Sequence, residues 1–283
     1  MYLRAGTKSL GRCIGGERDM FGAMFGDIVG SRFEFHNCRS KSFELFHPDC
    51  SFTDDTMMTL AVADALANAG GADEQTLTRE VIRSMKAIAA KYPDAGWGVS
   101  FARWLNEENP QPYQSFGNGA AMRVSPVGWY ARSEEEVRRL SRIVTAISHD
   151  HPEGLKGAEC VAMCVYLARS GSTKEQLLAL AREYYPEIGS YTCAQLSKSY
   201  RFDESCQGTV PQALTCFFEG TDFEDTIRNA VSVGGDTDTI CAIAGSVAEA
   251  FFGMTNMQRL CVILCLPEDL TPIITKFREV CTR

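Results

Sequence analysis

We expect the fold to be organised around Gly234-Gly235-Asp236-Thr237-Asp238-Thr239 and the apolar residues that follow it. A helix is predicted from Asp236 to Phe252, and apolar residues cover nearly every side of it: Ile240, Ile243, Ala244, Val247, Ala248 and Phe251. A helix that is hydrophobic all round is a buried one. We therefore expect a central helix whose first turn carries two carboxylates and faces an internal cleft.

Helical periodicity extends over most of the chain, whereas strand alternation is nearly absent. Further helices are predicted at Met20–Gly30, Asp54–Asn68, Leu77–Tyr92, Pro152–Arg169, Thr221–Val233, Asn256–Leu266 and Glu268–Thr282. Two capping boxes, Ser133 with Glu136 and Thr173 with Gln176, predict two more helix starts. Phe33 to Phe35 is strand-like but too short to found a sheet. The prediction is an all-α fold.

The chain is long enough for a sizeable core, with 283 residues of which 45% are hydrophobic. No Pro-rich or Gly/Ser-rich linker divides it, so we expect a single compact helical bundle over residues 20–283. Residues 1–19 are expected to be a disordered or expression-derived leader, with Met20 as a sensible alternative start.

Charge and composition limit the partners. The net charge of −8 argues against broad nucleic-acid binding, which needs a basic face. No run approaches the roughly 20 apolar residues of a membrane span. The 12 cysteines show no zinc-type spacing, so we expect free thiols, a reducing cytoplasm and, by default, a monomer.

Another acidic motif, Ser51-Phe52-Thr53-Asp54-Asp55-Thr56, precedes the helix predicted from Asp54. In chain order it is the first acidic motif, and Gly234 to Thr239 is the second. Threonine and aspartate favour helix N-caps, so each motif has a plain structural explanation. Capping, however, needs one such residue, and each motif has at least three oxygen-bearing side chains. If the two helix starts meet, four carboxylates share a small volume and need protons or cations to offset their repulsion. Two divalent ions would balance four negative charges, and an oxygen-only ligand set favours magnesium, manganese or calcium over zinc.

Three further segments hold candidate polar groups. Gly26 to Glu34 contains Asp27 and Glu34, seven residues apart, which share a helix face if the helix continues that far. Gly117-Asn118-Gly119-Ala120-Ala121-Met122-Arg123 is a glycine-rich loop that can point backbone N–H groups at a phosphate. Ser148-His149-Asp150-His151-Pro152-Glu153-Gly154 holds two of the four histidines. Each segment is also compatible with a turn or a helix start.

Taken together in chain order, the five segments resemble the ADP-ribosylglycohydrolase family, especially its bacterial members of the dinitrogenase reductase-activating glycohydrolase type. The resemblance runs from about Met20 to the C-terminus. It implies an all-α bundle with a dinuclear Mg²⁺ or Mn²⁺ centre. It assigns metal ligation to Thr53, Asp54, Asp55, Asp236, Asp238 and Thr239. It assigns catalysis to Glu34, Asp55 and Asp238, and the binding of ADP-ribose to Gly117, Asn118, Gly119, Met122 and His149.

The resemblance implies a hydrolase that cleaves the N- or O-glycosidic bond between ADP-ribose and a modified protein or small molecule. We expect an oxocarbenium-like transition state, with Glu34 either taking a proton from water or giving one to the leaving group. Two alternatives stay open: a non-catalytic ADP-ribose-binding, nucleotide-binding or structural protein on the same scaffold, and a hydrolase of another ribosyl or phosphate compound. The stretch Ser190 to Gln207 is individual to this chain and is a candidate border for the adenine or the target.

Overall fold

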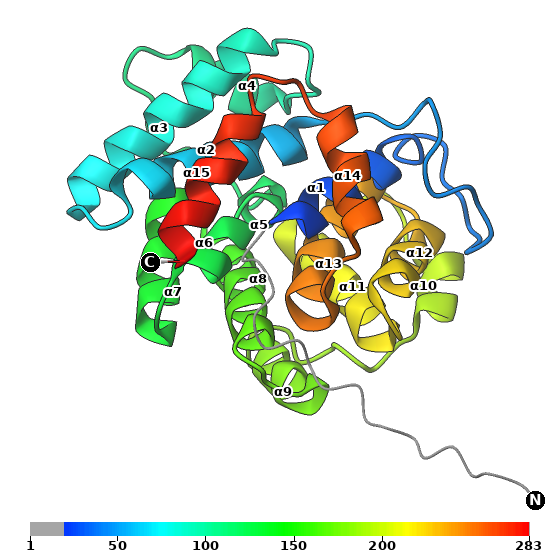
Figure 1. Cartoon of the computed structure of the whole chain (residues 1–283). Helices are drawn as coiled ribbons and strands as arrows, with labels where there is room; N and C mark the ends of the chain where they lie inside the picture. Colours follow the sequence, from blue (N-terminus) through cyan, green and yellow to red (C-terminus); the bar gives the residue numbers. More distant parts are fainter. Residues whose placement is uncertain (1–19, 283) are drawn as a thin grey trace, which may run out of the picture.

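Helix α13 (Thr237–Phe252) lies in the middle of the molecule, as its apolar sequence predicts (Figure 1). The computed structural model describes residues 20–282. Every α13 residue from Thr237 to Glu249 is buried. The helix ends at Gly253, whose positive φ of 78° suits a glycine C-cap. The N-terminus of α13, which carries the second acidic motif, is therefore fixed by the core.

Helix α1 (Phe21–Ser31) packs on α13 through three glycines spaced four residues apart. A Cβ on Gly22 or Gly26 would collide with backbone of α13 at Gly245 and Cys241, respectively. A Cβ on Gly30 would lie 2.6 Å from the Cα of Asp238. The absence of side chains at these positions lets the two backbones approach closely and sets the position of Asp238 relative to α1.

The remaining helices surround this pair in three groups (Figure 1). One group packs α2 (Asp54–Ala69) against α3 (Glu74–Lys91) and α15 (Thr271–Thr282). A second gathers around α8: α5 (Gly119–Met122), α6 (Ser125–Tyr130), α7 (Glu134–Ala146), α8 (Pro152–Arg169) and α9 (Lys174–Tyr184). The third contains α10 (Cys193–Ser199), α11 (Cys206–Glu219) and α12 (Phe223–Val233). Helix α4 (Val99–Asn106) contacts α3, and α14 (Asn256–Cys265) contacts α1.

The predicted all-α fold is confirmed. Residues 20–282 form a compact set of helices, and their β-structure is limited to one isolated bridge between Gly117 and Ser205. The capping box at Thr173 is present, whereas the Glu136 side chain accepts from the N–H of Arg132, one residue before the Ser133 N-cap. The sequence did not predict α4, α5, α6, α10 or α11, most of which are short.

The segment after α1 differs from what the sequence suggested. The helix ends at Ser31, so it does not continue to Glu34, and Phe33 to Phe35 form turns and bends in place of a strand. The expectations for residues 1–19 lie outside the described residues. Within residues 20–282, no helix combines the length and apolar character needed to cross a membrane. The cysteines of this part of the chain are free thiols, most of them buried, as expected.

Candidate metal and ADP-ribose site

The second acidic motif turns sharply into α13. Gly234 and Gly235 have φ values of 69° and 82°, a region that side chains other than glycine rarely adopt. Gly235 also faces the ring of Tyr200, which would collide with a Cβ. The turn places Asp236 at the N-cap of α13 and Asp238 in its first turn, where the helix dipole favours negative charge.

The first acidic motif is tied to α1 by Asp27, a completely buried carboxylate. Its oxygens accept hydrogen bonds from the backbone N–H and hydroxyl of Thr53 (2.9 and 2.7 Å) and from those of Thr56 (3.1 and 2.5 Å). The hydroxyl of Thr53 in turn accepts from the N–H of Asp55. Asp27 thus acts as the anion at the N-terminus of α2, which leaves the carboxylates of Asp54 and Asp55 free for another partner.

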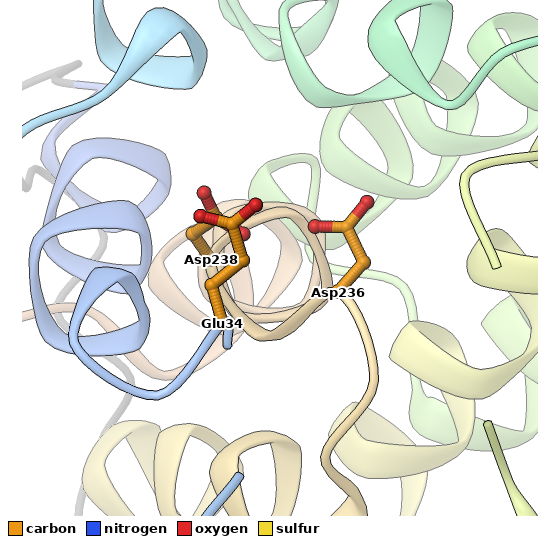
Figure 2. Close-up of side chains that lie close together, drawn as sticks. All are labelled: Glu34, Asp236 and Asp238. Atoms are coloured by element: carbon orange, nitrogen blue, oxygen red, sulfur yellow. The ribbon is translucent and has the colours of Figure 1, made fainter. Parts of the chain in front are cut away.

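The structure brings the two motifs together. The hydroxyl of Thr239 donates to Oδ2 of Asp55 at 3.3 Å, although the residues are 184 positions apart. Oxygens of Glu34, Asp236 and Asp238 lie within 4.8 Å of one another. Figure 2 shows these three carboxylates around the N-terminus of α13. The side chains expected to bind metal and the glutamate expected to act on the bond therefore share one site.

The site carries a large excess of negative charge. Burial, followed by neighbouring carboxylates, raises the pKa of Asp54, Asp55 and Asp238 well above the usual aspartate value. Burial raises the pKa of Asp27 to about 6, although its four hydrogen bonds oppose the shift. The pKa of Glu34 rises to about 7, first by burial and then by the charges of other carboxylates. Without cations, the folded protein therefore favours protonated carboxyl groups here.

Two carboxylate oxygens indicate what the site would bind. Among the described residues, Oδ1 of Asp55 and Oδ1 of Asp238 are buried without a hydrogen-bond partner. Buried polar atoms are rarely left unpaired, and one cause of such an atom is a bound ion. The side chains around them offer carboxylate and hydroxyl oxygens, the donors that Mg²⁺ and Mn²⁺ prefer. The residues present therefore fit divalent cations.

Glu34 is held beside the acidic cluster by Asn37. The side-chain amide of Asn37 donates to the carbonyls of Phe33 (2.7 Å) and Glu34 (3.0 Å). It also pairs with the backbone of Gly235 in both directions, at 2.8 and 3.0 Å. Asn37 therefore joins the Glu34 loop to the turn before Asp236. The sequence alone does not reveal this role, because the contact depends on a partner 198 residues away.

The glycine-rich loop meets the same site from the other side. The amide of Asn118 donates to Oδ2 of Asp236 at 2.6 Å. Nε2 of the buried His149 faces the loop, 3.2 Å from where a Cβ of Gly119 would lie and 3.6 Å from one at Gly117. Met122 is also buried beside Gly119. Asn118 thus joins the residues expected to bind ADP-ribose to those expected to bind metal.

The segment from Tyr200 to Ser205 packs against the glycine-rich loop and the second acidic motif. Its Glu204 carbonyl accepts from the N–H of Asn118 at 2.7 Å, and Tyr200 covers Gly235. Phe202 stacks on Phe35, the neighbour of Glu34, with ring centroids 6.3 Å apart, and the two side chains are 45% and 76% exposed. These two exposed rings form an aromatic rim beside Glu34. This segment falls within the stretch that the sequence marked as a border of the ligand.

A family model described as ADP-ribosylglycohydrolase matches residues 18–277. The chain belongs to the ADP-ribosylglycohydrolase family. The prediction of a hydrolase is thereby confirmed at the level of the family.

Curated relatives of this chain include the human ADP-ribosylhydrolase ARH3. The two are 27% identical, over 90% of this chain and 90% of the human protein. The ADP-ribosylarginine hydrolase Tri1 of Pseudomonas putida is 24% identical, over 84% of this chain and 70% of that protein. A solved structure described as an ADP-ribosylglycohydrolase-related protein complex has a TM-score of 0.66 at 23% identity, covering 94% of this chain and 98% of that chain. That likeness supports the fold.

Proposed function

We propose that the protein is a metal-dependent hydrolase that cleaves the glycosidic bond between ADP-ribose and a modified target, and that residues 20–283 form one catalytic domain. The observation that carries the proposal is the convergence of two remote acidic motifs, each with one unpaired buried carboxylate oxygen, beside a glycine-rich loop. The names of the relatives, ADP-ribosylhydrolase and ADP-ribosylarginine hydrolase, support the substrate class.

Two divalent cations, Mg²⁺ or Mn²⁺, would be held by oxygens of the two motifs: Thr53, Asp54, Asp55, Asp236, Asp238 and Thr239. When bound, the cations would supply charge for orienting ribose hydroxyls and for lowering the pKa of water. They would also replace the protons that the crowded carboxyl groups otherwise retain.

The residues of the chain then perform the remaining tasks. Gly117, Asn118 and Gly119 would line the diphosphate and ribose, with Met122 and His149 beside them. The N–H groups of Gly117 and Asn118 already donate to Ser115 and to the Glu204 carbonyl, so the backbone donor proposed for the ligand is the N–H of Gly119. Glu34, at the more exposed edge of the cluster, would exchange a proton with the attacking water or with the leaving group. The neighbouring carboxylates would stabilise the positive charge that develops on the ribose in an oxocarbenium-like transition state.

A substrate panel tests this proposal. The protein is incubated with proteins that carry ADP-ribose on arginine or on serine, first with a chelator and then after adding back Mg²⁺ or Mn²⁺. Mass spectrometry of the released ADP-ribose should show release with cations and none with the chelator. Binding of ADP-ribose without release from any substrate would favour the non-catalytic alternative.

A further inference from the structure

Arg123 is a buried cation at the last position of the glycine-rich segment, where it is the C-cap residue of α5. It is 1% exposed and forms no ion pair with a carboxylate among residues 20–282. Its guanidinium lies 5.3 Å from the ring centroid of Phe101, and its Nη2 donates to the hydroxyl of Ser148 at 2.8 Å. The same Nη2 lies 3.3 Å from Nδ1 of His149.

These contacts determine which nitrogen of His149 carries the proton. A guanidinium can donate hydrogen bonds but cannot accept them, so Nδ1 facing Nη2 must present its lone pair. The Ser148 hydroxyl lies 2.8 Å from the same Nδ1. Because that hydroxyl accepts from Arg123, its own proton is available to donate to Nδ1. Both neighbours therefore favour a histidine with an unprotonated Nδ1.

The ring is also kept neutral. Burial, and then the charge of Arg123, lowers the pKa of His149 well below its usual value. Burial lowers the pKa of Arg123 to about 10, so the guanidinium remains charged near neutral pH. A neutral histidine whose Nδ1 accepts hydrogen bonds carries its proton on Nε2. That nitrogen faces the Gly117 to Gly119 loop.

We propose that Arg123 is a positioning residue, which with Ser148 holds the proton of His149 on Nε2 so that Nε2–H donates to a diphosphate oxygen of the ligand. The ligand assignment rests on the proposed function, whereas the tautomer does not. The neutral Nε2–H would act together with the backbone N–H of Gly119. A diphosphate at the loop would also place negative charge near a buried guanidinium that lacks a carboxylate partner.

Stability alone does not account for an arginine at this position. Burying a charge without an ionic partner is costly, and an apolar side chain of similar length avoids that cost. Arg123→Met is therefore the informative variant. Arg169→Met is the matched control, because Arg169 also lies on an aromatic ring, Tyr166, and donates to backbone carbonyls at Gly128 and Ala131, away from the site.

The first measurement is the tautomer itself, by NMR of the full chain with ¹⁵N-labelled histidine. The protein has four histidines, and loss of one signal set in His149→Gln assigns the relevant ring. In the unsubstituted protein the proton should lie on Nε2. In Arg123→Met it should redistribute toward Nδ1, and in Arg169→Met it should not move. Ser148→Ala, which removes the other donor to Nδ1, provides a second variant should Arg123→Met fail to fold.

The second measurement is calorimetric titration with ADP-ribose at fixed Mg²⁺. The Kd should rise about tenfold in Arg123→Met, the effect of weakening one hydrogen bond to a charged group. Adenosine, which lacks the diphosphate, should bind both proteins equally. A proton on Nδ1 in the unsubstituted protein, or an unchanged tautomer in folded Arg123→Met, would overturn the proposal. Both results are independent of catalysis, so failure of the substrate panel alone leaves the tautomer assignment intact.

Discussion

Replacing Gly26 by alanine should lower stability and metal affinity together. Gly26 packs on backbone of α13, where its new Cβ would collide with the carbonyl group of Cys241 and lie 2.7 Å from the N of Ala242. Backbone atoms cannot rotate away as a side chain can. The new Cβ would lie 2.0 Å from the Cys241 carbonyl oxygen, so reaching an ordinary contact of 3.4–4 Å would require a shift of about 1.4 Å or more between these atoms.

The magnitude follows from two opposing effects. Overpacking costs about 3 kcal/mol when the backbone must move. Alanine in place of glycine inside a helix returns up to about 1 kcal/mol. The net loss of about 2 kcal/mol corresponds to a fall in Tm of about 4–8 °C for a chain of this size. Because the same shift moves Asp238 away from Asp27 and Asp55, turnover should fall at least about tenfold.

Thermal unfolding, calorimetric titration with Mn²⁺ and the ADP-ribose release assay measure these effects. Gly71→Ala is the matched control, because a Cβ at Gly71 meets nothing within 4 Å and the residue has no positive φ. That variant should keep its Tm, its metal affinity and its activity. If Gly26→Ala behaved like the control, close packing of α1 on α13 would not set the geometry of the site.

Three further predictions concern the acidic cluster. Glu34→Gln should lose about 100-fold or more in turnover while binding ADP-ribose normally, and near-normal turnover would reject the proposed proton exchange. Asp238→Asn should bind Mn²⁺ at least about tenfold more weakly, and an unchanged titration isotherm would count against the proposed ligand set. The gain in Tm on adding Mn²⁺ should be larger at about pH 8 than at about pH 6. The pKa values of Asp27 and Glu34 in the folded protein, about 6 and about 7, lie above those of the unfolded chain. Protonation of these groups therefore stabilises the metal-free protein at low pH. This contribution is lost as the pH rises through the two pKa values. An equal gain at both pH values would contradict this reasoning.

The sequence predicted the main helices because their signals are local. The all-round apolar character of α13 reports burial directly, and Thr53 and Asp236 mark helix starts that the structure contains. Five helices were not predicted. In α11, Pro211 lies inside the helix and interrupts the pattern that a sequence reading relies on.

The candidate site divides in the same way. Each of the two acidic motifs and the glycine-rich loop is one continuous run of residues, so the sequence alone indicates its composition. The roles of Asn37, Tyr200 and Arg123 arise from contacts with partners that are remote in sequence or buried, and no local pattern encodes such contacts. Asp27 is an acidic candidate in the sequence, but its function as the anion at the start of α2 follows only from its contacts with Thr53 and Thr56 in the folded chain.

The aromatic rim suggests where laboratory selection for new specificity should begin. Phe35 and Phe202 are exposed and lie on loops, so substitutions there should leave the core helices in place. A library that randomises these two positions can alter what approaches Glu34 without moving the carboxylates. The glycine-packed faces of α1 and α13 should be kept constant in such a library, because they contain no free volume for variation.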